Sequence, residues 1–294
     1  MTGYGHDPLF GVILTPDATD PARTVDLAIH AEHAGLDLVS VSDHQYHPRF
    51  LDAWTLLAWI AARTHSITVM PNVANLPLRP PAGLARAAAS LDALSGGRVE
   101  LGLGAGGHGD AIHSEGGPDL PIGERIDAFA EAVHVIRSLT TPGPPVTLDG
   151  RHHALHDATP GPPHPHPIGL WIGAVGPRML RLVGRTGDGW IPSATRIPPS
   201  GLDAANARID AAARAAGRDP SKIRRLYNIS APPSGHDRIW ADQLIKLATD
   251  HAVSGLNLFV DDHDTITRFA EDVAPHVRKA LGSHRGLETP RTRR

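Results

Sequence analysis

The feature that most constrains the fold is a repeated alternation of short apolar runs with longer stretches of helical spacing. Short runs rich in Val, Ile and Leu predict buried strands, and apolar residues three and four positions apart predict helices. Strands that alternate with helices predict right-handed crossovers and a parallel sheet. The predicted strands are 10–14, 36–42, 67–73, 98–104, 168–174, 188–193, 222–230 and 256–261.

The number of repeats favours a closed barrel. The chain has 294 residues, and a (β/α)8 TIM barrel typically takes about 250 residues. Eight strand–helix units over this length therefore predict an α/β fold of the (β/α)8 TIM barrel type. An open, doubly wound sheet is the alternative. No change of composition divides the chain, so we predict one domain over 1–282 and a flexible C-terminal tail over 283–294.

Two segments interrupt the alternation. Residues 105–122 are rich in Gly and His and form a predicted insertion after strand four. Residues 141–167 are rich in Pro and His and form an excursion before strand five. Within it, "VTLDGRHHAL" predicts a hairpin that turns at Asp149-Gly150. We expect both segments to lie over one face of the barrel.

Composition excludes several classes of function. The net charge is −3, so no broad positive field favours nucleic acid or an anionic membrane as partner. The chain has no cysteine, which excludes disulfides and thiolate catalysis. The N-terminus lacks the features of a signal peptide, and no apolar run reaches the ~20 residues of a membrane helix. These features predict a cytoplasmic protein that acts on a small molecule.

Strand two ends in an unusual group of polar residues. The stretch "VSVSDHQYHPRF" places Asp43 and His44 directly after the strand, and the active site of such barrels lies at the C-terminal ends of the strands. A pair of catalytic groups, a metal site and an ordinary solvated loop are the three possibilities. A metal would need several converging ligands, whereas strands three to five end in Asn and Gly. We therefore expect no metal.

Other strand ends should face the same cleft as Asp43 and His44. These residues are small or amide-bearing, which allows a ligand to approach the backbone closely. They are Asn72, Val73, Ala74 and Asn75 after strand three, Gly104, Ala105 and Gly106 after strand four, and Gly173, Ala174, Val175 and Gly176 after strand five.

The segment "WIGAVGPRML" predicts a phosphate site. A strand leads through small residues into a helix that begins with Gly176 and Pro177. The N-terminus of a helix offers free N–H groups and the positive end of a dipole. In such barrels, phosphate often binds in the C-terminal half. Arg178 lies in the first turn and either adds positive charge to the site or is solvated.

Four motifs together resemble those of the bacterial luciferase-like superfamily, whose members are flavin- or deazaflavin-dependent oxidoreductases. The motifs are "VSDHxxxP", "NVANLPLRPP", "LARAAASLDALSGGRVELGLGAG" and "GLWIGAVGPRMLRLVGRTGDGW", all within residues 10–192. The resemblance implies a barrel that binds a flavin-type cofactor at the strand ends. It further implies a cis peptide near Asn72-Val73 or Val73-Ala74, phosphate contacts from residues 173–176, and a homodimer.

The resemblance also narrows the cofactor. "SDH" after strand two resembles the branch that uses coenzyme F420 for hydride transfer to or from a small organic substrate; the alternative is FMN in an oxygen-dependent monooxygenase. His44 would then act as a general acid–base, or only orient the ring, and Asp43 would accept hydrogen bonds. Deazaflavin sugar-phosphate dehydrogenases carry a glutamate where this chain has Gly107; His108 or His113 either takes the place of that acid or is an ordinary loop histidine.

Two other classes of function stay open. A barrel of this kind can keep its ligand site and lose its chemistry, which would make the chain a non-catalytic flavin-binding protein. A metal-dependent barrel hydrolase is the other class, and it would require ligands that the strand ends do not provide. The segments 105–122 and 141–167 carry few charges, which favours an uncharged or mixed-character substrate.

Overall fold

A computed structural model describes residues 4–283 as a closed parallel barrel. The sheet order is β3-β2-β1-β11-β10-β9-β8-β5-β4, with every neighbouring pair parallel. The barrel closes beside β3, where Val69 N donates to Arg98 O at 2.8 Å and Glu100 N donates to Val69 O at 3.1 Å. The barrel prediction is therefore confirmed, and the alternative of an open sheet is wrong. The strands are β1 (Leu9–Leu14), β2 (Leu38–Val41), β3 (Thr68–Pro71), β4 (Ala74–Asn75), β5 (Leu101–Gly104), β8 (Leu170–Ile172), β9 (Gly189–Trp190), β10 (Arg224–Ser230) and β11 (Gly255–Phe259).

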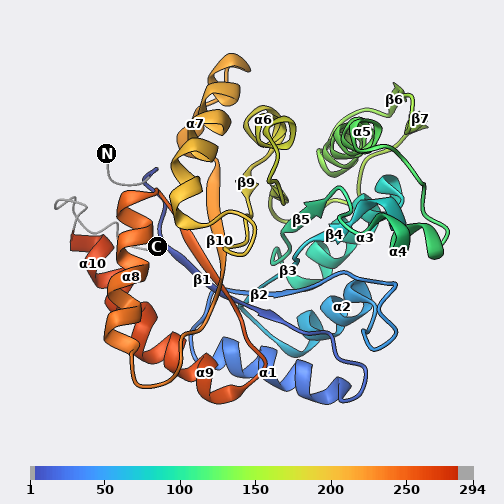
Figure 1. The fold of residues 1–294 in the computed structure, drawn as a ribbon. Coiled ribbons are helices and arrows are strands. Elements are labelled where there is room, and N and C mark those ends of the chain that lie inside the picture. The colour runs from blue at the N-terminus through green and yellow to red at the C-terminus, as the bar shows by residue number, and fades with distance from the viewer. Residues whose placement is uncertain (1–3, 284–294) are drawn as a thin grey trace.

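The helices form a layer around the strands (Figure 1). They are α1 (Pro21–His33), α2 (Ala53–Arg63), α3 (Pro81–Ser95), α5 (Ile122–Thr140), α6 (Pro177–Thr186), α7 (Pro199–Ala215), α8 (Asp237–Asp250), α9 (His263–Thr267) and α10 (Ala274–Ser283). Local chemistry sets their ends: the Asp20 and Asp52 carboxylates accept from backbone N–H groups in the first turns of α1 and α2. Gly96 ends α3 with a φ of 74°, a conformation that favours glycine.

The two predicted interruptions lie where expected. The insertion after β5 contains one short helix, α4 (Gly109–Ser114), which the sequence did not predict because six residues are too few to reveal a period. The excursion holds the predicted hairpin, β6 (Val146–Asp149) and β7 (Ala154–Ala158), which is antiparallel. It lies beside α5 at the edge of the molecule (Figure 1).

Two further details differ from the prediction. Strand three is divided into β3 and β4, with η1 (Leu76–Leu78) directly after it. The last helix contains a π-helical segment over Arg268–Val273. The predicted tail over 283–294 lies almost entirely outside the described residues. In the part of the chain that the structure describes, no helix combines the length and the apolar character needed to cross a membrane.

The alternating Leu and Gly residues of β5 have a steric cause. Leu101 and Leu103 are fully buried and belong to the main hydrophobic core. A Cβ at Gly102 would lie 2.1 Å from the Pro71 carbonyl oxygen, and a Cβ at Gly104 would lie 2.5 Å from Val73 Cγ2. Pro71 at the end of β3 and Val73 two residues later therefore approach β5 so closely that only glycine fits.

We expect Gly102→Ala to lower the thermal unfolding temperature by several degrees, because the new methyl group meets a backbone oxygen that cannot move freely. Overpacking of this kind costs about 1–3 kcal/mol or more. Gly83→Ala is the matched control, since it lies within α3 and a Cβ there meets nothing within 4 Å. Alanine favours the helix over glycine, so the control should be neutral or stabilising. Equal unfolding temperatures for the two variants, measured by circular dichroism, would contradict this account.

Candidate active site at the strand ends

The centre of the site is an ion pair between the buried Asp43, just after β2, and the partly buried Arg79, just after η1. Asp43 is 2% exposed. Arg79 Nε donates to Oδ2 at 2.6 Å and Nη2 donates to Oδ1 at 2.7 Å, a bidentate geometry. Asn75 N donates to Oδ2 at 2.9 Å, and Arg79 also pairs with Asp52 at the start of α2. The Asp43 carboxylate thus binds three elements of the chain together.

Arg79 is a site residue that sequence reasoning missed. It lies 36 residues beyond Asp43, inside the quoted motif "NLPLRPP". An arginine directly after a strand–turn segment was the available signal. The neighbouring Asp52 and Asp43 carboxylates raise the pKa of Arg79 despite its partial burial. The guanidinium is therefore permanently charged, and it holds Asp43 in place from the protein side.

His44 lies beside two other titratable groups. Its Nδ1 is 2.7 Å from Tyr46 Oη, and the His108 ring lies 5.7 Å from the His44 ring and 5.8 Å from the Tyr46 ring. Burial first, and the positive charges of His108 and His47 next, lower the pKa of His44 below 6.5. Burial and the Asp43 charge raise the pKa of Tyr46. Near neutral pH both groups are therefore uncharged.

The Tyr46 contact determines which nitrogen of His44 is available. The hydroxyl of Tyr46 can donate or accept, and in the tautomer with hydrogen on Nδ1 this N–H donates to Tyr46 Oη, which leaves the Nε2 lone pair free to accept a proton. No described residue bonds His44 Nε2, so that nitrogen is the one that can meet a ligand. Sequence reasoning singled out His44 but missed Tyr46, which lies two residues further along the same loop.

The peptide bond between Asn72 and Val73 is cis, at one of the two positions that the resemblance implied. Asn72 forms a reciprocal amide pair with Asn228 of β10, with N–O distances of 3.1 and 3.2 Å. The Val73 side chain approaches Gly104 of β5 and also Gly173 after β8, where a Cβ would lie 3.4 Å from Val73 Cγ1. Three of the predicted strand-end turns thus meet at Val73.

Asn75 supplies an acceptor with no partner. Its side chain is 5% exposed, and its Oδ1 is buried and bonds to no described group. A buried polar atom without a partner costs free energy comparable to a lost hydrogen bond. Gly106 lies close by, since a Cβ there would be 3.4 Å from this oxygen. An N–H or O–H group of a ligand could satisfy Asn75 Oδ1.

The turn between β8 and α6 is held open. Trp190 Nε1 donates to Ala174 O at 2.9 Å, so this tryptophan fixes the turn. A Cβ at Gly176 would meet nothing within 4 Å, and no side chain caps the N-terminus of α6. Arg178 turns away from this opening: Nη2 donates to Asp127 at 2.6 Å and Nη1 donates to Gly123 O at 3.3 Å. Its charge is thus paired with α5.

The remaining predicted residues, Ala74, Ala105, Val175 and Pro177, lie at their expected strand-end positions; Ala74 is buried in β4, and Val175 is exposed in the turn after β8. Ala105 follows β5 and is partly buried against the main core, while Pro177 is the first residue of α6. Among the described residues, no group of three or more His, Asp or Glu side chains is arranged to hold a metal ion.

Comparison with known proteins identifies the family to which the chain is similar. The family model described as "Luciferase-like monooxygenase" matches residues 9–265. An F420-dependent glucose-6-phosphate dehydrogenase of Kineococcus radiotolerans is 34% identical over 238 residues, covering 77% of this chain and 68% of the relative. A 5,10-methylenetetrahydromethanopterin reductase of Archaeoglobus fulgidus is 34% identical over 277 residues, covering 93% of this chain and 78% of the relative.

A solved structure shows the same fold. An F420-dependent secondary alcohol dehydrogenase in complex with an F420-acetone adduct superposes with a TM-score of 0.81, at 23% identity, over 92% of this chain and 99% of that chain. With a family model that spans most of its length and relatives above 30% identity, this chain belongs to the luciferase-like family of oxidoreductases.

Proposed function

We propose that the protein is an oxidoreductase that uses coenzyme F420 to move a hydride to or from a small organic substrate. The similarity to relatives that are named F420-dependent, at 34% identity over most of the chain, carries the proposal. The position of His44, close to the Asp43–Arg79 ion pair, also supports the proposal. In the same proposal, the enzyme is a cytoplasmic homodimer.

The residues at the strand ends fit such a cofactor. Val73 offers an apolar surface for one ring face, and Asn75 Oδ1 offers an unpaired acceptor for a ring N–H. The open turn at Gly173–Gly176 and the uncapped N-terminus of α6 would hold the phosphate. Arg178 could add charge there only by leaving Asp127. When bound, the deazaflavin supplies or accepts the hydride.

His44 handles the proton that accompanies hydride transfer. Oxidation of a substrate alcohol releases a proton from its hydroxyl group, and a neutral imidazole near that oxygen can accept it. In the reverse direction, the imidazolium returns the proton. Tyr46 fixes the orientation of the ring, and the exposed His108 can pass the proton to solvent. Asp43 acts through Arg79 and Asn75, since its oxygens already bond to the chain.

The substrate is not a sugar phosphate in this proposal. Gly107 stands where the resemblance predicts the acidic glutamate of the sugar-phosphate dehydrogenases. His108 is adjacent and lies near His44, whereas His113 belongs to the exposed face of α4. A proton relay through His108 thus replaces a carboxylic acid, which favours a different small substrate.

Titration of the purified protein should show preference for F420 over FMN. We expect F420 to bind at least tenfold more tightly than FMN. Its binding would be measured by the quenching of F420 fluorescence. Gly104→Ala should weaken F420 binding about tenfold, because its Cβ would lie 2.5 Å from Val73 Cγ2 and displace that surface. Gly107→Ala is the matched control, since a Cβ there meets nothing within 4 Å.

The opposite preference would overturn the proposed cofactor. Tight binding of reduced FMN, with consumption of oxygen, would favour the alternative of an FMN-dependent monooxygenase. Binding of F420 without turnover of any alcohol or carbonyl compound would favour a non-catalytic binding protein.

The dependence of kcat/KM on pH should reflect the titration of His44. In the direction of alcohol oxidation, the neutral imidazole is the active form, so kcat/KM should fall on the acid side, with a midpoint below 6.5. His108→Ala removes a nearby positive charge, and the midpoint should therefore move to higher pH, towards 6.5. His44→Asn should abolish the acid limb and lower kcat at least ~100-fold. An unchanged midpoint in His108→Ala would contradict the assignment.

A further inference from the structure

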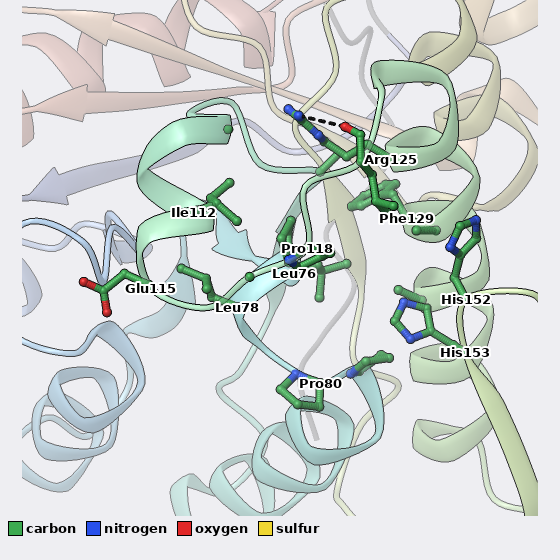
Figure 2. A pocket seen from close by; sticks show the side chains of 18 of the residues that line it. Leu76, Leu78, Pro80, Ile112, Glu115, Pro118, Arg125, Phe129, His152 and His153 are labelled. Carbon is green, nitrogen blue, oxygen red and sulfur yellow. Dashed lines mark hydrogen bonds between the residues drawn. The ribbon is translucent and has the colours of Figure 1, made fainter.

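A cavity lies behind the turn after β5. It has a volume of about 540 Å³, within the ~300–1,000 Å³ that is typical of small-molecule sites. The segment after β4, the insertion with α4, helix α5 and the β6–β7 turn each contribute to its walls (Figure 2). The side chains Leu76, Leu78, Ile112, Pro118 and Phe129 give it a mainly apolar lining.

The polar groups of this cavity are concentrated at the β6–β7 turn. His152 and His153 line the cavity there, and Figure 2 shows both imidazole rings on one side, across from Leu78 and Ile112. His152 Nε2 is buried and bonds to no described group. Burial is the main cause that lowers the pKa of His153 below 6.5. The side of the cavity thus carries a buried nitrogen that lacks a partner.

The two histidines are held in place by their backbone. Glu131 Oε2 on α5 accepts from His152 N at 2.7 Å and from His153 N at 2.9 Å. A Cβ at Gly150 would lie 2.6 Å from the same oxygen, so this close approach requires glycine. The turn is therefore fixed to α5, and the imidazole positions follow from that contact.

The lining carries one side chain of each charge, Arg125 and Glu115. Arg125 donates to Gly106 O and to Leu120 O, both at 3.1 Å, and so holds the two ends of the insertion together (Figure 2). Glu115 is an exposed carboxylate at the rim. The chemistry of the lining thus favours an uncharged ligand.

We propose that this cavity binds an uncharged, mainly hydrocarbon molecule with one hydroxyl or carbonyl oxygen that pairs with His152 Nε2. The site is separate from the proposed cofactor contacts, although Ala105, which follows the β5 strand, forms part of its wall. Binding here requires no cofactor, so the proposal stands or fails independently of the proposed function.

Prodan, an uncharged naphthyl ketone whose emission shifts to the blue in apolar surroundings, is a suitable probe. Titration of the full chain without cofactor should give one saturable site with a blue shift. His152→Phe keeps the ring size but removes the nitrogen, and it should weaken binding about tenfold, as expected for loss of one hydrogen bond. The backbone contacts of His152 with Glu131 do not depend on its side chain.

Ala128→Trp tests occupancy by filling the cavity, since Ala128 lines it on α5. We expect at least tenfold weaker prodan binding, with F420 binding unchanged. Ile122→Trp is the control, because Ile122 lies on the same helix, 69% exposed and outside the lining. Trp59→Ser controls for a second apolar groove between α1 and α2. Unfolding temperatures of all variants verify the fold.

The inference would be overturned by the absence of saturable prodan binding, or by binding that Ala128→Trp leaves intact. Loss of binding in Trp59→Ser alone would assign the probe to the groove between α1 and α2 and would also overturn it. Prodan binding without F420 binding would reject the proposed function but support the cavity.

Discussion

The ion pair of Asp43 and Arg79 is the interaction on which the rest of the site depends. Taking two charges out of water is costly, and the cost is recovered only with good geometry and with hydrogen bonds to the remaining lone pairs. Both conditions are met here, because the guanidinium is bidentate and Asn75 N completes the shell. The pair fixes the end of β2 to the segment after β4. This contact holds His44 and Asn75 at the same end of the barrel, where the strands terminate.

The shape of that mouth follows from steric constraints. The chain enters the barrel mouth at the cis peptide between Asn72 and Val73, and glycines at 102 and 104 make room for it. The Asn72–Asn228 amide pair crosses to β10. The amide pair and the contacts with β5 position Val73 through the chain itself, and preorganisation of this kind lowers the cost of binding. His44 lies in the loop after β2, held by Tyr46.

The sequence predicts a large part of this arrangement. Alternation of strands and helices was sufficient for the barrel, because each strand is short, apolar and followed by a helix with clear start and stop signals. Asp43 and His44 could be assigned to the mouth since parallel strands of a barrel end on one face. The cis peptide could be placed to within one residue, but only through the resemblance to a family.

Other features depend on contacts that no local pattern encodes. The pairing of Arg79 with Asp43 joins residues far apart in sequence. The sequence around a single arginine does not indicate which carboxylate it pairs with. The role of Tyr46 depends on a side-chain distance. Arg178, for which the sequence left a phosphate contact and a solvated position open, pairs with Asp127 on α5. The cavity behind β5 needs four segments to meet, so composition alone could indicate only that the insertion and excursion carry few charges.

A double-mutant cycle on the ion pair tests the central claim most directly. Asp43→Asn, Arg79→Met and the double variant would each be measured for free energy of unfolding and for F420 affinity. Removal of one partner from a buried pair costs about 3–5 kcal/mol, and the double variant should lose less than the sum of the two. Each single variant should also bind F420 at least tenfold more weakly. Additive losses of stability, or unchanged F420 affinity in Asp43→Asn, would contradict the account.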